Sequence, residues 1–540
     1  MSGWTDHLVV APVVVPLLAG ALMVLAGEGR RGLNAALGLA STAALVGLAL
    51  ALLRLADAAG ADGAAAAAVR VYRLGDWPAL FAIVLVLDRL SALMLALTAV
   101  LGAAALVFSL ARWHRAGAHF HPLLQFQLVG LNGAFLAGDL FNLFVFFEVM
   151  LAASYGLALH GSGAARVRAG LHYVAVNLTA SLLFLVAASV VYGISGTLNM
   201  ADLARRMAGL AAEDRALLEA GLAVLGVAFL VKAAMWPLGF WLPPTYAAAS
   251  APAAAILSIL SKVGVYAVLR LWLLLFEGGA GGFGGAWLTA GGLLTIAFGS
   301  AAALAAQDMA RLAGASVLVS SGTLLAAIGT GQGEVTGGAL FYLASSVPAI
   351  AAFFLLIELV ERGRDVGADV LAVTREAFGE GAEDEYLDDD EEVGVAIPAT
   401  MAALGLGFMG CALLLAGLPP LSGFLAKFAM LAPLFGAGDD GVPATAWALL
   451  GALILSGLAT VVAMTRAGID AFWASPAREA PRVRVLEIAP VALLLALCVS
   501  LTVLAGPAMG YMQAAARSLH APQGYIAGVL PAPGAEGAGR

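Results

Sequence analysis

This chain consists of long apolar runs that are separated by short polar connections. An apolar run of about 20 residues can cross a bilayer, and lipid forces each backbone polar group to bond within its segment, which favours helices. The first run lacks a basic segment and a cleavage site, so we interpret it as a helix and not as a signal peptide. The pattern predicts about fourteen spans, at 8–27, 33–54, 88–111, 121–137, 139–160, 168–193, 217–236, 252–275, 284–305, 311–330, 337–360, 398–417 with a continuation at 421–436, 445–466 and 487–507.

Composition supports an all-α polytopic membrane protein. Hydrophobic residues make up 62% of the chain and charged residues only 11%, against about 25% charged residues in soluble domains. Cys411 and Cys498 have no Cys or His partner at ligand spacing, which argues against a disulfide framework or a metal site. The GxGxxG pattern at 405–410 lies inside an apolar run, so we interpret it as a helix-packing feature. The sequence shows no nucleotide, haem or iron–sulfur motif, and we expect no cofactor.

Arginines in the connections predict the orientation of the chain. With the N-terminus outside, fourteen arginines fall in cytoplasmic connections and seven in outer ones. Cytoplasmic loops usually carry the excess of basic residues. The distribution therefore predicts that both termini lie outside.

Two segments depart from the apolar pattern. The connection 362–396 contains ten carboxylates between Glu376 and Glu392. We interpret it as a solvated, poorly ordered cytoplasmic loop, with attraction of cations or contact with another subunit as the alternative. The tail after Gly510 is expected to be loose.

Two of the expected spans are interrupted by proline. One runs through Lys232 into Trp236-Pro237 and Pro243-Pro244, and the other meets Pro419-Pro420 before it resumes through Lys427. Proline removes a backbone donor and clashes with the preceding turn, so each helix should break there. Broken helices at corresponding places of two halves indicate an internal repeat with a transport site near the midplane.

Lysine occurs only three times, at Lys232, Lys262 and Lys427, and each lies inside an apolar run. Most of the 24 arginines lie between the runs. A codon bias toward arginine explains the shortage of lysine but not these positions. A guanidinium stays charged at any accessible pH, whereas an ammonium can lose its proton when it is removed from water. We therefore interpret the three lysines as positions that need a removable proton.

Glu148 is an acidic residue in the same situation as these lysines, because it also lies inside an apolar run, among the phenylalanines of 139–160. A charge at the centre of a membrane costs roughly 2.5–3.5 kcal/mol, so Glu148 and three lysines would cost on the order of 10 kcal/mol if unpaired and dry. They must face one another or water. A buried Glu–Lys pair titrates as a unit and can pass a proton on, which predicts a proton relay. The alternatives are a static Glu148–Lys232 ion pair and lysines that extend to the membrane surface.

Other polar residues give weaker signals. His172, near the cytoplasmic start of its span, is a candidate for loading protons, and a structural role at the interface is the alternative. Asp88, Asp139 and the Asp308–Arg311 pair lie at helix ends, where capping accounts for them.

Four motifs occur in one order along the chain: 139–155 around Glu148, 231–244 around Lys232, 261–266 around Lys262 and 417–428 around Lys427. With these motifs the chain resembles the D subunits of Mrp-type multisubunit cation/proton antiporters, which are homologous to the antiporter-like subunits of respiratory complex I. The resemblance covers the third to the thirteenth span. It implies two inverted five-helix repeats, each with a broken helix. The expected regions are helices 1–3 in 1–120, a first repeat in 121–275, a second repeat in 284–466, and a last helix with its tail in 467–540.

The resemblance also implies a role for each buried charge. Glu148 would pair with Lys232, Lys262 would bridge to the second half, and Lys427 would end a lateral polar path. The family often has a histidine on the eleventh span, where this chain reads Ala344-Ser345-Ser346-Val347. A hydroxyl stores no proton at neutral pH, so the sequence predicts that water serves the step between the halves.

The leading functional hypothesis is proton movement through this path coupled to export of Na⁺ or another monovalent cation. The partners implied are H⁺, the cation, the lipid bilayer and the A, B, C, E, F and G type subunits of such a complex, in a bacterial inner membrane. One alternative is a redox-driven subunit of complex I or of a membrane-bound hydrogenase. The other is an inert membrane scaffold whose charges only hold helices together.

Overall fold

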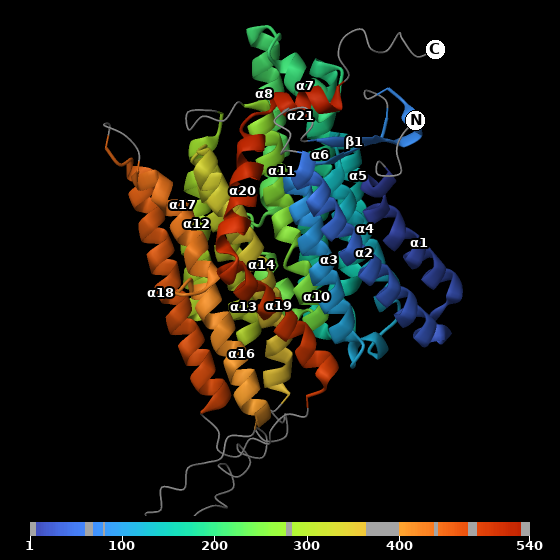
Figure 1. The fold of residues 1–540 in the computed structure, drawn as a ribbon, viewed down its shortest axis with the longest axis vertical. Coiled ribbons are helices and arrows are strands. Elements are labelled where there is room, and N and C mark those ends of the chain that lie inside the picture. The colour runs from blue at the N-terminus through green and yellow to red at the C-terminus, as the bar shows by residue number, and fades with distance from the viewer. Residues whose placement is uncertain are drawn as a thin grey trace, which may run out of the picture.

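The computed structural model describes residues 7–59, 69–78, 82–276, 283–362, 399–436, 441–473 and 483–530. Most helices run along the long axis of one bundle (Figure 1). Within the described ranges, eleven helices are long and apolar enough to cross a membrane. The elements are α1 (Ala11–Ala26), α2 (Arg31–Ala59), β1 (Arg70–Arg73), β2 (Val84–Leu87), α3 (Arg89–Ser109), α4 (Phe120–Leu136), α5 (Leu140–Ala158), α6 (Ala164–Ser195), α7 (Met200–Met207), α8 (Ala212–Lys232), α9 (Leu242–Ala248), α10 (Ala251–Leu257), α11 (Leu260–Leu275), α12 (Gly285–Ala305), α13 (Met309–Gly329), α14 (Gly333–Glu361), α16 (Ala399–Ala416), α17 (Ser422–Phe435), α18 (Ala444–Phe472), α19 (Val485–Val503), α20 (Ala505–Leu519) and α21 (Gln523–Val529).

The all-α membrane fold predicted from the sequence is confirmed, and each expected span coincides with one or two helices. The number fourteen and the inverted repeats stay predictions. The acidic connection, including Glu376 to Glu392, lies outside the described residues apart from Arg362. So do residues 531–540 of the tail.

The expectation of a loose chain after Gly510 is wrong for the described part of the tail. Residues 505–519 form α20 and residues 523–529 form α21. Tertiary contacts hold them: the Tyr511 hydroxyl donates to the Arg89 carbonyl at 2.9 Å, and Gln513 Nε2 donates to the Glu334 carbonyl at 3.1 Å. A composition rich in alanine and glycine gave no sign of these long-range bonds.

The expected proline breaks are present. α8 ends at Lys232, and α9 begins at Leu242 after the Trp236-Pro237 segment. α16 ends at Ala416 and α17 begins at Ser422, on either side of Pro419-Pro420. Both lysines of the interrupted spans therefore lie beside a break in the helix.

A third break differs from the sequence pattern, because the run 252–275 predicts one continuous span. α10 ends at Leu257 and α11 begins at Leu260. At this point the Ser258 hydroxyl donates to the Ala255 carbonyl at 2.7 Å. A serine that bonds local backbone offers the chain an alternative to the regular helical ladder, which accounts for a break without proline.

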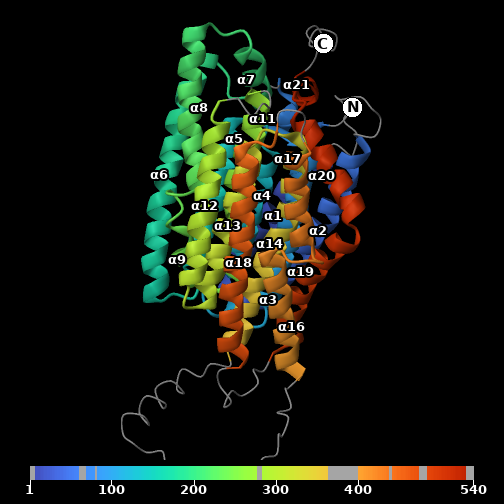
Figure 2. The same cartoon turned by 90° about the vertical axis from the view of Figure 1, so that its left-hand side faces the viewer.

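The centre of the bundle is formed by α10, α11, α13 and α14. The most apolar windows of these helices are completely buried, whereas those of α5, α6, α12, α16, α18 and α19 are only partly covered. Figures 1 and 2 show α13 and α14 toward the middle of the bundle, and Figure 2 shows α6 at one edge. Small residues allow a close approach between α12 and α13: a Cβ on Gly292 would lie 2.7 Å from the Ala326 Cα. The helix that carries Lys262 is thus separated from lipid by other helices.

The described ends of the chain meet at one end of the bundle. β1 pairs with β2 in an antiparallel hairpin that the sequence did not predict, and Arg73 Nη2 donates to the Val529 carbonyl of α21 at 3.3 Å. Figure 1 shows β1 and α21 at this end. The two described ends therefore lie on the same side of the bundle.

The opposite end is closed by a polar network. Trp113 Nε1 and Arg362 Nη2 both donate to the Glu358 carboxylate at 2.6 Å, and Arg362 Nη1 donates to Glu487 at 2.6 Å. His160 Nε2 lies 2.9 Å from the Trp113 carbonyl, and burial lowers the pKa of this imidazole. The network ties α14 and α19 to the connection after α3.

Candidate functional site

The first cluster joins Glu148, Ser181 and Lys232 from α5, α6 and α8. The Ser181 hydroxyl donates to Glu148 Oε1, and Lys232 Nζ donates to Ser181 Oγ at 3.4 Å. Lys232 Nζ also lies 5.4 Å from the centre of the Phe147 ring, an arrangement that favours a cation. Within the described residues Glu148 and Lys232 form no direct ion pair. A hydroxyl therefore separates the acid from the base, and we call these three residues the Glu–Ser–Lys set.

Lys262 lies at the centre of the bundle on α11 and is completely buried. Its Nζ donates to Ser321 Oγ at 2.9 Å and to the Val317 carbonyl at 3.4 Å, both on α13. No carboxylate of the described residues forms an ion pair with it. The alternative that Lys262 extends to the membrane surface is wrong, because its amine points to another buried helix. A hydroxyl partner can accept from an ammonium or donate to a neutral amine, so both protonation states have a hydrogen bond.

Lys427 is 8% exposed and lies on α17. Its Nζ donates at 2.8 Å to the carbonyl of Ala416, the last residue of α16. The carbonyl end of a helix carries a partial negative charge, which is suited to a cation. A Cβ at Gly417, whose φ is +74°, would lie 2.7 Å from Nζ. Glycine is therefore needed at this turn both for its backbone conformation and for the space that the amine fills.

Serine hydroxyls fill the region between Lys262 and Lys427. Ser320 on α13 and Ser346 on α14 have their Oγ atoms 3.0 Å apart. Ser345 on α14 and Ser422 on α17 have theirs 2.7 Å apart. The segment where the sequence lacks a histidine thus bonds in two directions. Neighbouring residues in a helix point about 100° apart, which lets Ser345 and Ser346 reach different helices.

The structure brings together some of the predicted residues and not others. It joins Glu148 to Lys232, but through Ser181, which none of the sequence motifs includes. It gives Lys262 and Lys427 their own separate partners on α13 and α16. The sequence carried little signal for Ser181, because the same span also contains Asn177, Thr179 and Ser189.

The weaker candidates lie elsewhere. Asp139 caps α5 and Asp308 caps α13, each accepting at 2.7 Å from a backbone nitrogen three residues later. His172 is exposed and lines a hollow of about 1140 Å³ together with Trp241, Asp308 and Arg311. The hollow lies beside α9, next to the broken segment.

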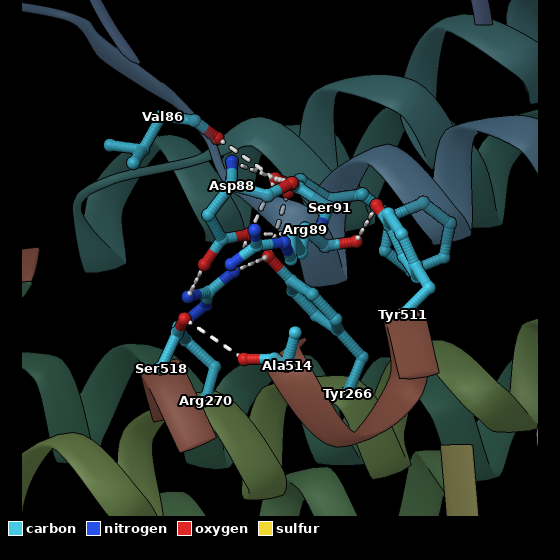
Figure 3. A network of polar contacts seen from close by, with 10 residues as sticks. Val86, Asp88, Arg89, Ser91, Tyr266, Arg270, Tyr511, Ala514 and Ser518 are labelled. Atoms are coloured by element: carbon cyan, nitrogen blue, oxygen red, sulfur yellow. Dashed lines mark hydrogen bonds and ion pairs between the residues drawn. The ribbon is translucent and has the colours of Figure 1, made fainter. Parts of the chain in front are cut away.

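One buried ion pair, between Asp88 and Arg270, was not predicted from the sequence (Figure 3). Asp88 caps α3 as expected, accepting from the Ser91 nitrogen at 2.9 Å. Arg270 of α11 also donates to both oxygens of Asp88, the second bond spanning 2.8 Å, and to the Tyr266 hydroxyl at 3.3 Å. The guanidinium lies 5.3 Å from the centre of the Tyr525 ring of α21. An arginine inside an apolar run was the available signal.

Comparisons with known proteins agree with this architecture. Residues 137–444 match the family described as NADH:quinone oxidoreductase/Mrp antiporter, TM. The D subunit of a probable K(+)/H(+) antiporter of Rhizobium meliloti is 59% identical over 99% of both chains. The D subunit of a Na(+)/H(+) antiporter of Alkalihalophilus pseudofirmus is 33% identical over 97% of this chain and 99% of its own. Among solved structures, a chain of the Mrp complex from Dietzia sp. DQ12-45-1b gives a TM-score of 0.80 at 25% identity, covering 97% of this chain and 99% of that one.

The match spans more than half of the chain and includes α5, α8, α11 and α17, the helices that carry Glu148 and the three lysines. Relatives match almost from end to end. The chain therefore belongs to the family of NADH:quinone oxidoreductase and Mrp antiporter membrane subunits.

Proposed function

We propose that the chain is the D subunit of a multisubunit monovalent-cation/proton antiporter. The names of the full-length relatives support this function. The observation that carries it is a series of buried or half-buried ionisable residues, Glu148, Lys232, Lys262 and Lys427, each with a hydrogen-bond partner. Intramembrane ionisable residues are expensive and mark ion pathways. The chain works as a transporter subunit and catalyses no covalent chemistry.

In this proposal a proton reaches Glu148, passes through Ser181 to Lys232, and moves on to Lys262 and then Lys427. The bridging hydroxyl of Ser181 accepts a proton at its oxygen while it releases its own hydrogen, so it stays neutral. Glu148 and Lys232 store the proton on either side. Movement of one charge through 100 mV provides about 2.3 kcal/mol, which is available for moving a cation in the other direction.

We propose K⁺ as the exported cation, because the relative at 59% identity is named for K⁺, whereas the one at 33% is named for Na⁺. The described residues contain no cluster of three or more acidic, histidine or cysteine side chains that could hold a metal ion. In this proposal the chain works together with the other subunits of the complex, of the A, B, C, E, F and G types. The complex would lie in a bacterial inner membrane with both termini of this chain outside.

The test measures cation-dependent proton flux in membrane vesicles that contain the complete complex. Glu148→Gln and alanine at each lysine should abolish flux while the complex assembles normally on a native gel. Flux in K⁺ should exceed flux in Na⁺. Normal flux per assembled complex in all four variants would refute the path and support a scaffold. Flux that needs a quinone or another redox substrate would instead favour a complex I or hydrogenase subunit.

A further inference from the structure

The proposed path has a long step between Lys262 and Lys427, and no further carboxylate, amine, guanidinium or imidazole of the described residues bonds within it. The hydroxyl of Tyr342 on α14 bonds to Ser320 at its side. Five serine hydroxyls occupy this step, and all are at most 7% exposed. Three contacts link them to each other and to Lys262: Lys262 to Ser321, Ser320 to Ser346, and Ser345 to Ser422. Ser422 lies on the same helix as Lys427 and five residues before it.

These serines differ from several other buried serines of the bundle, and they share with Ser41 and Ser181 a bond to a side chain of a neighbouring helix. A serine inside a helix commonly donates to a carbonyl of its own helix about one turn earlier. Ser109, Ser316 and Ser456 do so, with distances of 2.7 to 3.0 Å. Within the described residues, none of the five serines between the lysines bonds to its own helix backbone through its hydroxyl. Each bonds to a side chain of a neighbouring helix.

We propose that Ser321, Ser320, Ser346, Ser345 and Ser422 form a hydroxyl relay that carries protons from Lys262 to Lys427, in place of a histidine on α14. This inference rests on the proposed function. It adds the identity of the groups that connect the two halves of the path.

Each step conserves atoms and charge. The Lys262 ammonium gives a proton to Ser321 Oγ, and Ser321 releases its own hydrogen to the next oxygen. No serine keeps a charge, because each forms one O–H bond as it breaks another. At the end Lys262 is a neutral amine and Lys427 is an ammonium, which donates to the Ala416 carbonyl at 2.8 Å. Rotation of the hydroxyls then restores the starting arrangement.

Three links lie within single helices. Ser320 and Ser321 are neighbours on α13, Ser345 and Ser346 are neighbours on α14, and Ser422 precedes Lys427 on α17. No direct hydrogen bond joins the members of these pairs in the described residues. The links within α13 and α14 each require a side-chain rotation or one intervening water. The link from Ser422 to Lys427 requires water, because residues five apart on a helix point about 140° apart. Proton transfer is therefore slowest at the links within single helices. A substitution interrupts the contacts between helices most directly.

The experiment removes the two α14 hydroxyls in the complete complex. Ser345→Ala together with Ser346→Ala should lower cation-dependent proton flux by about 100-fold, the lower end of what a positioned proton-transfer group contributes. Ser346→Thr, which keeps a hydroxyl, should retain flux when Ser346→Ala does not. Ser316→Ala is the matched control: it removes a buried hydroxyl from α13 that donates to the Leu312 carbonyl of its own helix, and flux should stay at the wild-type level.

A second readout separates proton transfer from packing. If the hydroxyls carry protons, the ratio of flux in H₂O to flux in D₂O should rise in Ser346→Ala and stay unchanged in Ser316→Ala. Wild-type flux in the double alanine variant, or loss of flux without a change in this ratio, would overturn the relay. Lys262→Ala distinguishes the two proposals. If only the serine relay is wrong, this variant should still be inactive, because Lys262 belongs to the proposed path. An active Lys262→Ala variant would contradict the whole path.

Discussion

Two base–acid sets inside this bundle are built differently. At the end of the bundle that holds both described chain ends, Arg270 donates directly to both oxygens of Asp88 and lies against two tyrosine rings. In the Glu–Ser–Lys set, a hydroxyl separates acid and base, and Lys232 donates to it over 3.4 Å. The first set fixes two charges in a defined geometry, as a planar guanidinium can.

The difference indicates two uses of buried charge. A directly paired guanidinium cannot release a proton at accessible pH, so Asp88 and Arg270 can only hold helices in place. An amine next to a hydroxyl can release its proton, and the hydroxyl can exchange a proton with Glu148. Changing the base in each set should therefore damage transport in one case and stability in the other.

The largest effect is expected from Lys232→Arg. Arginine keeps the positive charge but cannot release its proton, so cation-dependent flux should fall by about 100-fold or more, as for loss of a proton-transfer group. The complex should still assemble, as measured on a native gel. Wild-type flux in this variant would mean that Lys232 acts only as a fixed charge.

Arg270→Ala should chiefly affect stability. It leaves Asp88 buried without its partner, and breaking a buried ion pair in this way costs about 3–5 kcal/mol. The purified complex should unfold at a lower temperature, and flux per assembled complex should stay normal. Arg215→Ala is the control, because its pair with Glu219 lies near the surface on α8 and contributes little. Loss of flux in a stable Arg270→Ala complex would place this arginine in the transport path.

Ser181→Ala tests the bridge itself. Without the hydroxyl, Glu148 and Lys232 lose their shared partner and only water can connect them. Flux should fall by about tenfold, less than for a lysine variant, because water can replace part of a hydroxyl's role. Ser189→Ala removes an exposed hydroxyl of the same helix, bonded to the Leu185 carbonyl, and should leave flux unchanged. Equal flux in both variants would argue against the bridge.

The smallest effect is expected at Tyr525. Its hydroxyl is buried and has no hydrogen-bond partner among the described residues, whereas its ring contacts Arg270. Tyr525→Phe should therefore leave the unfolding temperature unchanged or raise it slightly. Tyr525→Ala removes the cation–π contact and should cost about 0.5–2 kcal/mol in addition to lost packing. A strongly destabilised Tyr525→Phe variant would show that the hydroxyl has a partner.

The sequence predicted the parts of the fold and site that have a strong local signal. Long apolar runs indicated the spans, prolines indicated two breaks, and charges in apolar surroundings identified Glu148 and the lysines. Ser181 and Ser346 could not be found in this way, because a serine in a membrane helix usually bonds to its own backbone. Their partners depend on which helices become neighbours.

Other misses have related causes. The β1–β2 hairpin and the fold of α20 and α21 depend on contacts between distant parts of the chain, which local composition does not encode. Arg270 carried the same signal as the lysines, a charge inside an apolar run. Only its bidentate contact with Asp88 distinguishes a fixed ion pair from a proton site.

The position of α11 also limits how the protein can be made. This helix carries both Lys262 and Arg270, and the central cation alone costs about 2.5–3.5 kcal/mol on insertion scales. Asp88, the partner of Arg270, lies 182 residues earlier and enters the membrane first. The nascent α11 therefore depends on earlier helices that already hold a carboxylate in place, and its insertion is a cooperative step of biogenesis.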